Sequence, residues 1–396
     1  MSLLGDSPVK RTRRETLVGL LGIGTASPAT VTQEQLLQLS IEVSRPTPSQ
    51  KAWLTRLFRR SGIQACGSVL AGIASDRNIL QPEQRLESIR AFYPPSTGPA
   101  DGGPTTEARM VRYAAEAPAM AASAASGALL QSQTTPAEIT HLFTASCTGF
   151  MAPGLDCALI QRLGLSPEIR RLHVGFMGCH AAFNVLAAAR DVVRADSRAR
   201  VLVCCVELCS LHLAYGWEPG KLVANALFAD GAGAAVIGQL DEGNADALRL
   251  SDTASMLMPN SREAMTWRIG NHGFEMTLSP GLPNLIREYL RPWCEKWLAR
   301  HGLKITDIAR WAIHPGGPSI LDAVGEALAL PNEALDHSRE VLAQHGNMSS
   351  ATVLFILRKM LEHMHDGPCV ALGLGPGLMV EGMLFRENAD QPAKIS

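Results

Sequence analysis

Residues 171–190, RLHVGFMGCHAAFNVLAAAR, contain the corner around which the chain is organised. Alternating apolar residues at 172–176 predict the end of a buried strand. Gly175 and Gly178 bracket a tight turn, and Cys179 follows directly. The residues after Cys179 are apolar almost all round a helix, which is typical of a helix inside a protein. The stretch therefore predicts a strand–turn–helix corner with Cys179 at the N-terminus of a buried helix.

The position of Cys179 suits a reactive thiol. The free N–H groups and the dipole at a helix N-terminus favour an anion, and the thiolate is the nucleophilic form of cysteine. A small core cysteine packed beside glycines is the alternative, because free cysteine is among the most buried residue types. The corner alone leaves both interpretations open.

Composition argues against several classes of function. The chain has 396 residues, of which 46% are hydrophobic, so it can bury a large α/β core. The formal net charge is −1 and the isoelectric point is about 6.8, which does not indicate nucleic acid or an acidic membrane as a partner. No apolar run reaches the roughly eighteen residues of a membrane helix, so no membrane span is expected.

The nine cysteines are irregularly spaced and form no CxxC pair. Their odd number and the apolar surroundings of several of them favour reduced thiols in a cytoplasmic protein. The pair Arg13-Arg14 precedes an apolar run and superficially resembles a twin-arginine export signal. We interpret residues 17–23 instead as a first strand that leads into a turn.

Expected strands and helices alternate along the whole chain. The expected strands are residues 17–23, 141–145, 201–206, a strand within 228–237, 248–258, 274–278, 311–313, 369–372 and 379–385, and the expected helices are residues 32–43, 49–62, 105–130, 156–163, 285–300, 319–328 and 351–363. This alternation predicts an α/β fold with a mixed, largely parallel sheet in each of two halves. A polar stretch at 241–246 predicts the boundary between an N-terminal half, residues 1–242, and a C-terminal half, residues 243–396.

Three polar residues lie at strand or helix ends, where open α/β sheets place their sites: Cys179, His314 and Asn347. A cysteine nucleophile needs a base or a cationic partner, and histidine is the usual one. An asparagine amide beside a histidine can donate hydrogen bonds to an enolate or an oxyanion. Taken singly, His314 could be a turn histidine and Asn347 a plain helix cap.

Four segments together resemble the chalcone synthase-like type III polyketide synthases. They are GFMGC at 175–179, WAIHPGGPSIL at 311–321, HGNMSSATV at 345–353 and GLGPGLMVEG at 373–382. The resemblance runs from about residue 22 to residue 381, which is nearly the whole chain. HPGG and GNMSS separate this family from the fatty-acid type ketosynthases III, which share the same cysteine, histidine and asparagine.

The resemblance implies the thiolase fold, with two similar α/β halves whose mixed sheets are layered between helices, and a homodimer. It also implies that Cys179 carries the acyl group, while His314 and Asn347 bind the thioester carbonyl and stabilise the enolate formed when malonyl-CoA loses carbon dioxide. Repeated condensation onto an acyl-CoA starter would give a pyrone, resorcinol, phloroglucinol or naphthol. The substrates are CoA thioesters, and we expect neither a metal nor an organic cofactor.

The resemblance further implies residues that shape the substrate cavity. Phe228 matches the family's first gatekeeper phenylalanine, between the CoA tunnel and the cavity, and Phe274 matches the second; ordinary core packing is the alternative for both. Gly375 and Pro376 lie in the loop that resembles the cavity wall.

Three cavity positions depart from the plant members of the family. Cys147, in SCTGF, stands where plant members carry a threonine and resembles bacterial members that make naphthols, resorcinols or pyrones. Cys209 and His212, in ELCSLHL, replace other threonines. These replacements put a flavonoid-type product in doubt.

Arg56 and Arg60 lie on a basic helix, roughly where the family places cations for the CoA phosphates. A merely solvated charged face is the alternative. Two other functions remain open from the sequence. One is a ketosynthase III-type enzyme that performs a single condensation, and the other is a catalytically silent thiolase-fold protein that binds acyl-CoA.

Overall fold

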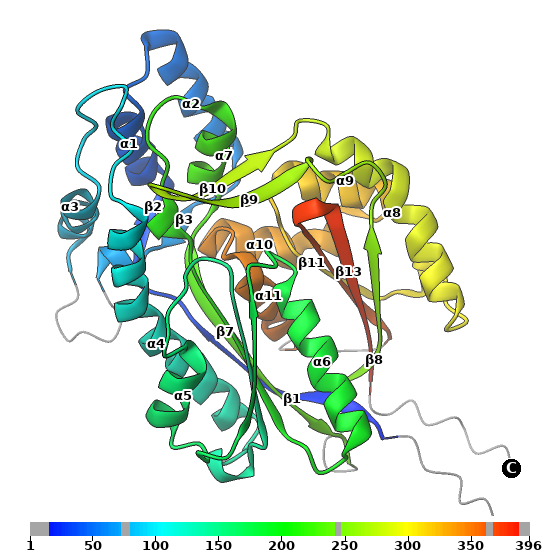
Figure 1. The fold of residues 1–396 in the computed structure, drawn as a ribbon. Helices are drawn as coiled ribbons and strands as arrows, with labels where there is room; N and C mark the ends of the chain where they lie inside the picture. Colours follow the sequence, from blue (N-terminus) through cyan, green and yellow to red (C-terminus); the bar gives the residue numbers. More distant parts are fainter. Residues whose placement is uncertain (1–15, 73–79, 242–246, 362–366, 388–396) are drawn as a thin grey trace, which may run out of the picture.

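The computed structural model describes residues 16–72, 80–241, 247–361 and 367–387. In these ranges the chain forms a nine-stranded sheet with the order β11-β12-β13-β8-β1-β7-β6-β4-β5 (Figure 1). Its strands are β1 (Val18–Ala26), β4 (His141–Ser146), β5 (Arg170–Gly175), β6 (Val201–Leu208), β7 (Asp230–Gln239), β8 (Leu248–Leu257), β11 (Arg310–Ile313), β12 (Cys369–Gly375) and β13 (Met379–Glu387). Two short pairs lie apart from it: β2 (Thr30–Thr32) with β3 (Ala65–Gly67), and β9 (Met265–Gly270) with β10 (Gly273–Leu278).

The sheet differs from the expected pair of largely parallel sheets. The strands of the two expected halves belong to one continuous sheet, because Gly19 and Leu20 of β1 pair with Arg249 and Leu248 of β8. Of the eight strand pairings in the described sheet, five are antiparallel, so the prediction of a largely parallel arrangement is wrong. The expected boundary at residues 242–246 lies outside the described residues.

Strand β5 lies at one edge of the sheet, whereas the sequence predicts a buried strand at this place. Four of its six residues are exposed, including Leu172 at 39%. The next strands inward, β4 and β6, are completely buried. The apolar alternation before Cys179 therefore belongs to an edge strand, which pairs with only one neighbouring strand in the described chain.

The helices enclose the sheet on both sides (Figure 1). Their bounds are α1 (Gln33–Ser44), α2 (Pro48–Arg60), α3 (Pro82–Phe92), α4 (Thr106–Gln131), α5 (Leu155–Leu163), α6 (Ala181–Ala195), α7 (Pro219–Leu227), α8 (Leu282–Ala299), α9 (Pro318–Leu328), α10 (Asp336–His345) and α11 (Thr352–Leu361). Figure 1 shows α4 and α5 on one side and α8 and α9 on the other, with α6 and α11 between them. Within the described ranges, no helix has the length and apolar character needed to cross a membrane.

The alanine-rich helix α4 packs closely on β1. A Cβ atom at Gly24 would collide with the backbone of Ala124, and one at Gly22 would lie 2.7 Å from the carbonyl oxygen of Ala128. Only glycine in the strand and small residues in the helix allow this approach. The close contact fixes the inner strands, and these strands carry the elements of the site.

Most predicted helices are present, with boundaries shifted by one to three residues. Thr32 caps α1, since its side chain accepts from the backbone N–H of Gln35. The end of the expected helix 351–363 lies outside the described residues. Helices α3, α7 and α10 have no counterpart among the expected elements.

Candidate active site

Cys179 lies in the turn between β5 and α6, as predicted. Phe176 and Gly178 adopt positive φ values of 61° and 85° in this turn. A Cβ atom at Gly178 would collide with the ring of Pro376, so the turn needs glycine there. Cys179 itself is 4% exposed, and α6 begins two residues later at Ala181. The sequence thus places the thiol correctly at the start of a buried helix.

The thiol of Cys179 is held in its protonated form by its surroundings. Burial raises its pKa to about 12, although a hydrogen bond from the Ser349 hydroxyl, at 3.6 Å from the sulfur, acts in the opposite direction. The N–H groups and the dipole at a helix N-terminus favour a thiolate, but desolvation outweighs that effect here. Ionisation of the thiol therefore has to be coupled to a proton acceptor.

His314 follows β11 and faces the same cavity as Cys179. Its backbone N–H donates to the carbonyl oxygen of Leu372 at 2.8 Å, which fixes the residue at the end of the strand. Its side chain is buried, and neither ring nitrogen has a hydrogen-bond partner. Burial lowers the pKa of His314 to about 3, and the nearby His180 adds to the effect. His314 is therefore a neutral imidazole with unused hydrogen-bonding capacity.

Asn347 is fixed by bonds on both sides of its backbone. Its N–H donates to the carbonyl of Leu227 at 2.8 Å, and its carbonyl accepts from Ala229 at 2.9 Å. Its side-chain Oδ1 accepts from the N–H of Ser349 at 2.8 Å. A hydrogen bond from the Asn347 side chain to Cys179 acts to lower the pKa of that thiol, and the same amide NH2 group can donate to a carbonyl oxygen bound beside the sulfur.

Cys179, His314 and Asn347 line one small cavity with an empty volume of about 360 Å³. The sequence places these residues on three separate segments, and the fold brings them together as predicted. A buried thiol, a neutral histidine and an amide donor are the groups that acyl transfer through a cysteine thioester requires.

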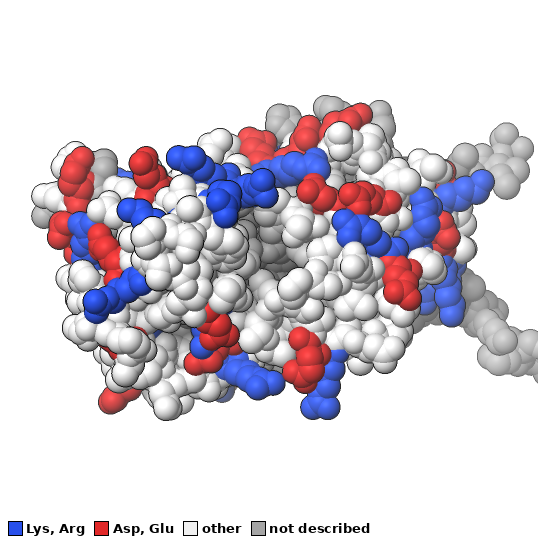
Figure 2. Space-filling model, turned by 90° about the horizontal axis from the view of Figure 1, so that it is seen from above, with Lys and Arg blue, Asp and Glu red and all other residues white. Residues whose placement is uncertain are grey.

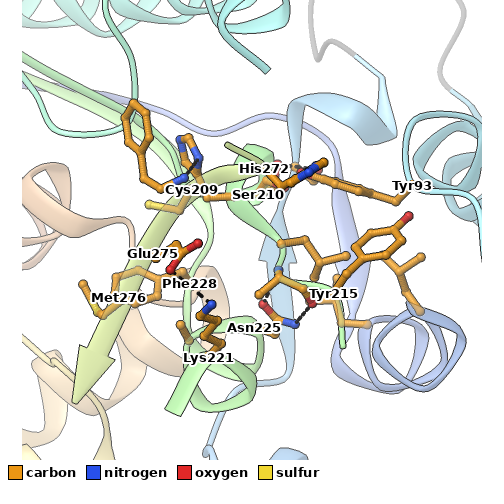
Figure 3. Close-up of a pocket in the computed structure, with 18 of the residues that line it drawn as sticks. Tyr93, Cys209, Ser210, Tyr215, Lys221, Asn225, Phe228, His272, Glu275 and Met276 are labelled. Atoms are coloured by element: carbon orange, nitrogen blue, oxygen red, sulfur yellow. Dashed lines mark hydrogen bonds and ion pairs between the residues drawn. The ribbon is translucent and has the colours of Figure 1, made fainter. Parts of the chain in front are cut away.

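A second and larger cavity, with an empty volume of about 1030 Å³, adjoins the first (Figure 3). Cys209, His212 and Phe274 line it, in agreement with their expected role in shaping a cavity. Phe228 and Met276 line both cavities, so these two side chains separate them.

Phe228 lines both cavities, as a gatekeeper would, whereas Phe274 lines only the larger one. Phe274 and Met276 point to the same face of β10 because they are two residues apart. Of the two, Met276 reaches the small cavity, and Phe274 stacks on His212 with ring centroids 4.3 Å apart. The expected second gatekeeper is thus replaced by Met276.

His212 shapes the larger cavity without offering it a free nitrogen. Its Nδ1 accepts from the backbone N–H of Phe274 at 2.9 Å, which leaves Nε2 as the donor to the carbonyl of Thr148 at 2.7 Å. Burial lowers the pKa of His212 to about 3. The residue is a neutral link between two backbone segments and has no proton to exchange with a ligand.

Cys147, Gly375 and Pro376 surround the Cys179 turn and line neither of these two cavities. The sulfur of Cys147 accepts from the backbone N–H of Gly178 at 2.9 Å, and Pro376 packs on the same glycine. Leu374, the residue before Gly375, lines the small cavity.

Gly375 packs against His180, the residue after the nucleophile, and a Cβ atom at Gly375 would collide with its ring. His180 is 2.9 Å from Oδ1 of Asn184, whose amide donates to Glu381 at 3.2 Å. These contacts direct His180 to its own helix and to β13, away from the substrate side of the cavity.

Glu207 is a buried carboxyl beside the site that the sequence analysis missed. It accepts from the backbone N–H of Cys147 at 2.9 Å and from the hydroxyls of Thr148 and Ser350. Burial raises its pKa to about 7 in spite of these bonds. A glutamate near the end of a wholly apolar strand, in VLVCCVEL, is the signal that could have identified it.

Arg56 and Arg60 are exposed on α2 and line neither cavity. Leu54 and Phe58 anchor the helix by its buried face. Figure 2 shows Lys and Arg side chains gathered along one rim of a hollow that is otherwise lined by uncharged residues. Among the described residues, no group of three or more His, Cys, Asp or Glu side chains is arranged to hold a metal ion.

Comparison with known proteins identifies the family. Residues 7–241 match the N-terminal domain model of the chalcone and stilbene synthases, and residues 249–388 match the C-terminal domain model. The chain therefore belongs to the chalcone and stilbene synthase family, the type III polyketide synthases.

Two curated relatives are each 38% identical to this chain. One is an alpha-pyrone synthesis polyketide synthase-like protein of Mycobacterium tuberculosis, matched over 63% of this chain and 65% of that protein. The chain thus spans slightly less than two thirds of the length of this relative. The other is the 1,3,6,8-tetrahydroxynaphthalene synthase of Streptomyces peucetius subsp. caesius, matched over 68% of this chain and 72% of that protein.

Solved structures confirm the fold class. PKS-I of the brown alga Ectocarpus siliculosus superimposes with a TM-score of 0.84 at 28% identity, over 95% of this chain and 100% of that one. The C-terminal type III polyketide synthase domain of Steely1 from Dictyostelium gives a TM-score of 0.82 at 25% identity, over 94% and 99%. The chain has the thiolase fold of these proteins.

Proposed function

We propose that the protein is a type III polyketide synthase that elongates an acyl-CoA starter with malonyl-CoA. The observation that carries this proposal is the small cavity, where a buried thiol faces a histidine with two unpartnered ring nitrogens and the side chain of Asn347. Buried polar groups without partners are costly, and a ligand that pairs with them is the usual reason for keeping them.

The reaction begins with transfer of the starter to Cys179. The thiol loses its proton, the sulfur attacks the thioester carbonyl of the acyl-CoA, and CoA leaves as the thiol after taking up a proton. The carbonyl oxygen becomes negative during the attack, and His314 and Asn347 are the donors positioned to stabilise it.

Extension then uses the same two donors. Malonyl-CoA loses carbon dioxide, the remaining electron pair forms an enolate, and the enolate oxygen accepts hydrogen bonds from His314 and Asn347. The enolate carbon attacks the thioester on Cys179, which forms the new carbon–carbon bond and releases the sulfur. The β-ketoacyl-CoA product returns to Cys179 for the next round. No step needs a metal or an organic cofactor beyond the CoA that the substrates carry.

Cyclisation of the extended chain would give a pyrone, resorcinol, phloroglucinol or naphthol. The names of the two curated relatives, one for an alpha-pyrone and one for a hydroxylated naphthalene, support a product of this range. Arg56 and Arg60 would hold the CoA phosphates at the surface. We place the enzyme in the cytoplasm, in keeping with its nine cysteines, none of which forms a disulfide.

We also propose a homodimer. Within the described ranges strand β5 pairs along only one edge, and Phe150 and Met177 beside it are 46% and 40% exposed. Unpaired edges and clustered apolar side chains at a surface are commonly covered by a partner. Sedimentation velocity tests this part separately from activity, and a monomer at micromolar concentration would refute it.

Product analysis by mass spectrometry tests the proposed activity. The protein is incubated with malonyl-CoA alone and with malonyl-CoA plus short, long and aromatic acyl-CoAs, and the Cys179→Ala variant is the control. Products with two or more added malonyl units, absent from the control, are expected. A single β-ketoacyl product would indicate a ketosynthase III-type enzyme, and no CoA release with any starter would indicate a silent acyl-CoA-binding protein.

A further inference from the structure

The larger cavity has a wall whose polar side chains are already bonded within the protein. Asn225 uses both ends of its amide on Ala214, accepting from the N–H and donating to the carbonyl at 2.9 Å each. The hydroxyl of Tyr93 donates to the carbonyl of Ser210 at 3.0 Å, and Trp267 donates to the carbonyl of Cys147 at 2.8 Å. Both nitrogens of His212 are used in the same way.

The charged groups of this cavity are also paired with one another. Lys221 lies 3.1 Å from a carboxylate oxygen of Glu275 and 3.1 Å from one of Glu218. Figure 3 shows the ion pair between Lys221 and Glu275 beside Phe228. Because the lysine already faces two carboxylates, it is a poor partner for a carboxylate or phosphate on a ligand.

Aliphatic side chains supply much of the remaining wall. Leu36 and Leu39 of α1, Ile89 of α3, and Leu70 and Leu213 all line the cavity. Figure 3 shows Phe228 and Met276 at one side of the cavity and Tyr93 and Tyr215 at the opposite side. Ile89 precedes Tyr93 by one helical turn, so it lies at the side far from the passage to Cys179.

We propose that this cavity holds the aliphatic, unfunctionalised tail of the starter acyl group, which passes between Phe228 and Met276 while its carbonyl is bonded to Cys179. The inference rests on the proposed function and names the class of starter. A growing polyketide carries carbonyl oxygens that need donors, and among the residues that line the two cavities the nitrogens without partners are those of His314, in the small one. A hydrocarbon tail loses no hydrogen bonds in the larger one.

Comparison of the rates with different starters, each given separately, tests the proposal. The protein is given malonyl-CoA with octanoyl-CoA, cinnamoyl-CoA or 4-coumaroyl-CoA, and with no other starter, and kcat/KM is measured from CoA release and products. Octanoyl-CoA is expected to exceed 4-coumaroyl-CoA by about tenfold or more, since a phenol hydroxyl buried without a partner costs at least this factor. Equal or better use of 4-coumaroyl-CoA, or priming by malonyl-CoA alone, would overturn the inference but leave the proposed function standing. Absence of malonyl-dependent products with every starter would refute the proposed function itself.

Substitutions at Ile89 locate the tail. Ile89→Phe fills the far side of the cavity and is expected to lower kcat/KM for dodecanoyl-CoA about tenfold relative to butanoyl-CoA, because one or two methylene groups in an apolar pocket are worth this much. Ile89→Ala enlarges the cavity and should shift the preference towards the longer starter. Ala91→Phe, exposed on the same helix, is the matched control. An unchanged ratio of the two starters in both Ile89 variants, with folding verified by circular dichroism, would contradict the assignment.

Discussion

The two adjoining cavities differ in what their polar groups do. In the small cavity, the ring nitrogens of His314 have no partner in the protein. In the larger cavity, His212 is also buried but gives both nitrogens to the backbone. Burial lowers the pKa of both histidines to about 3, so the pKa alone does not distinguish them. The unused hydrogen-bonding capacity marks the place of chemistry, and the satisfied groups determine the shape of the space beside it.

The largest effect is expected when the unpartnered donor is removed. His314→Ala should lower malonyl-CoA decarboxylation by about 100- to 1,000-fold, which is the usual cost of losing one oxyanion donor. The rate is measured as carbon dioxide release. His301→Ala is the control, because His301 bonds Asp252 and lines neither cavity. If His314→Ala lowered the decarboxylation rate less than tenfold, the unpartnered histidine of the small cavity would not be the main donor, and the proposed difference between the two cavities would be wrong.

For the stability of the fold, we expect His212 to matter more than His314. His212→Phe leaves the N–H of Phe274 and the carbonyl of Thr148 without partners, and should lower the free energy of unfolding by about 1–3 kcal/mol. His314→Leu removes no side-chain hydrogen bond and should unfold at an equal or higher urea concentration. Equal destabilisation of the two variants would show that His212 is not a structural link.

The pH dependence of stability should sharpen this contrast. In the folded chain His212 stays neutral down to a pKa of about 3, but in the unfolded chain it binds a proton near its ordinary pKa of 6.5. The unfolded state therefore gains protons as the pH falls from 6.5 towards 3, and the free energy of unfolding decreases by about 1 kcal/mol per pH unit for each such histidine. Glu207 acts in the opposite direction, since its folded pKa of about 7 lies above the ordinary 4.5.

Urea unfolding at several pH values between 7 and 4 isolates the contribution of His212. The His212→Phe variant should lose less stability than the wild type over this range, because it lacks one of the groups that protonate only on unfolding. Parallel curves for the two proteins would mean that His212 is protonated in the folded state.

The smallest effect concerns the two cysteines that replace plant threonines. Cys209→Thr alters the wall of the larger cavity and should change the distribution of product lengths by a few fold. Cys147→Thr alters a residue that contacts the Cys179 turn, so it should lower the overall rate with little change in that distribution. Mass spectrometry of the products separates these outcomes, and the opposite pattern would exchange the roles of the two residues.

The nucleophile corner could be predicted from local sequence because its determinants are adjacent. The glycines, Cys179 and the apolar helix specify a strand–turn–helix by themselves. The continuity of the sheet could not be predicted, because it depends on the pairing of Leu20 with Leu248, two residues that are remote in the chain. The outer position of β5 was missed for a similar reason, since apolar alternation indicates one buried face and does not reveal whether an edge has a neighbour.

The site residues likewise divide into those that local motifs predict and those that depend on contacts between remote segments. His314 and Asn347 lie in specific motifs, and the sequence placed both beside Cys179. The residue that accompanies Phe228 was misassigned, because period-two alternation puts Phe274 and Met276 on the same face of β10 and does not say which of them reaches the gap. Ser349 and Glu207 were missed because their roles arise from contacts with residues 60 to 170 positions away in the chain.

Formation of the acyl-enzyme tests the central claim most directly. The protein is incubated with octanoyl-CoA without malonyl-CoA, digested, and mapped by mass spectrometry. The account predicts one octanoyl group on Cys179, with one CoA released per active site and no acylation in Cys179→Ala. Acylation of a different cysteine among the nine in the chain, or undiminished turnover in Cys179→Ala, would contradict it.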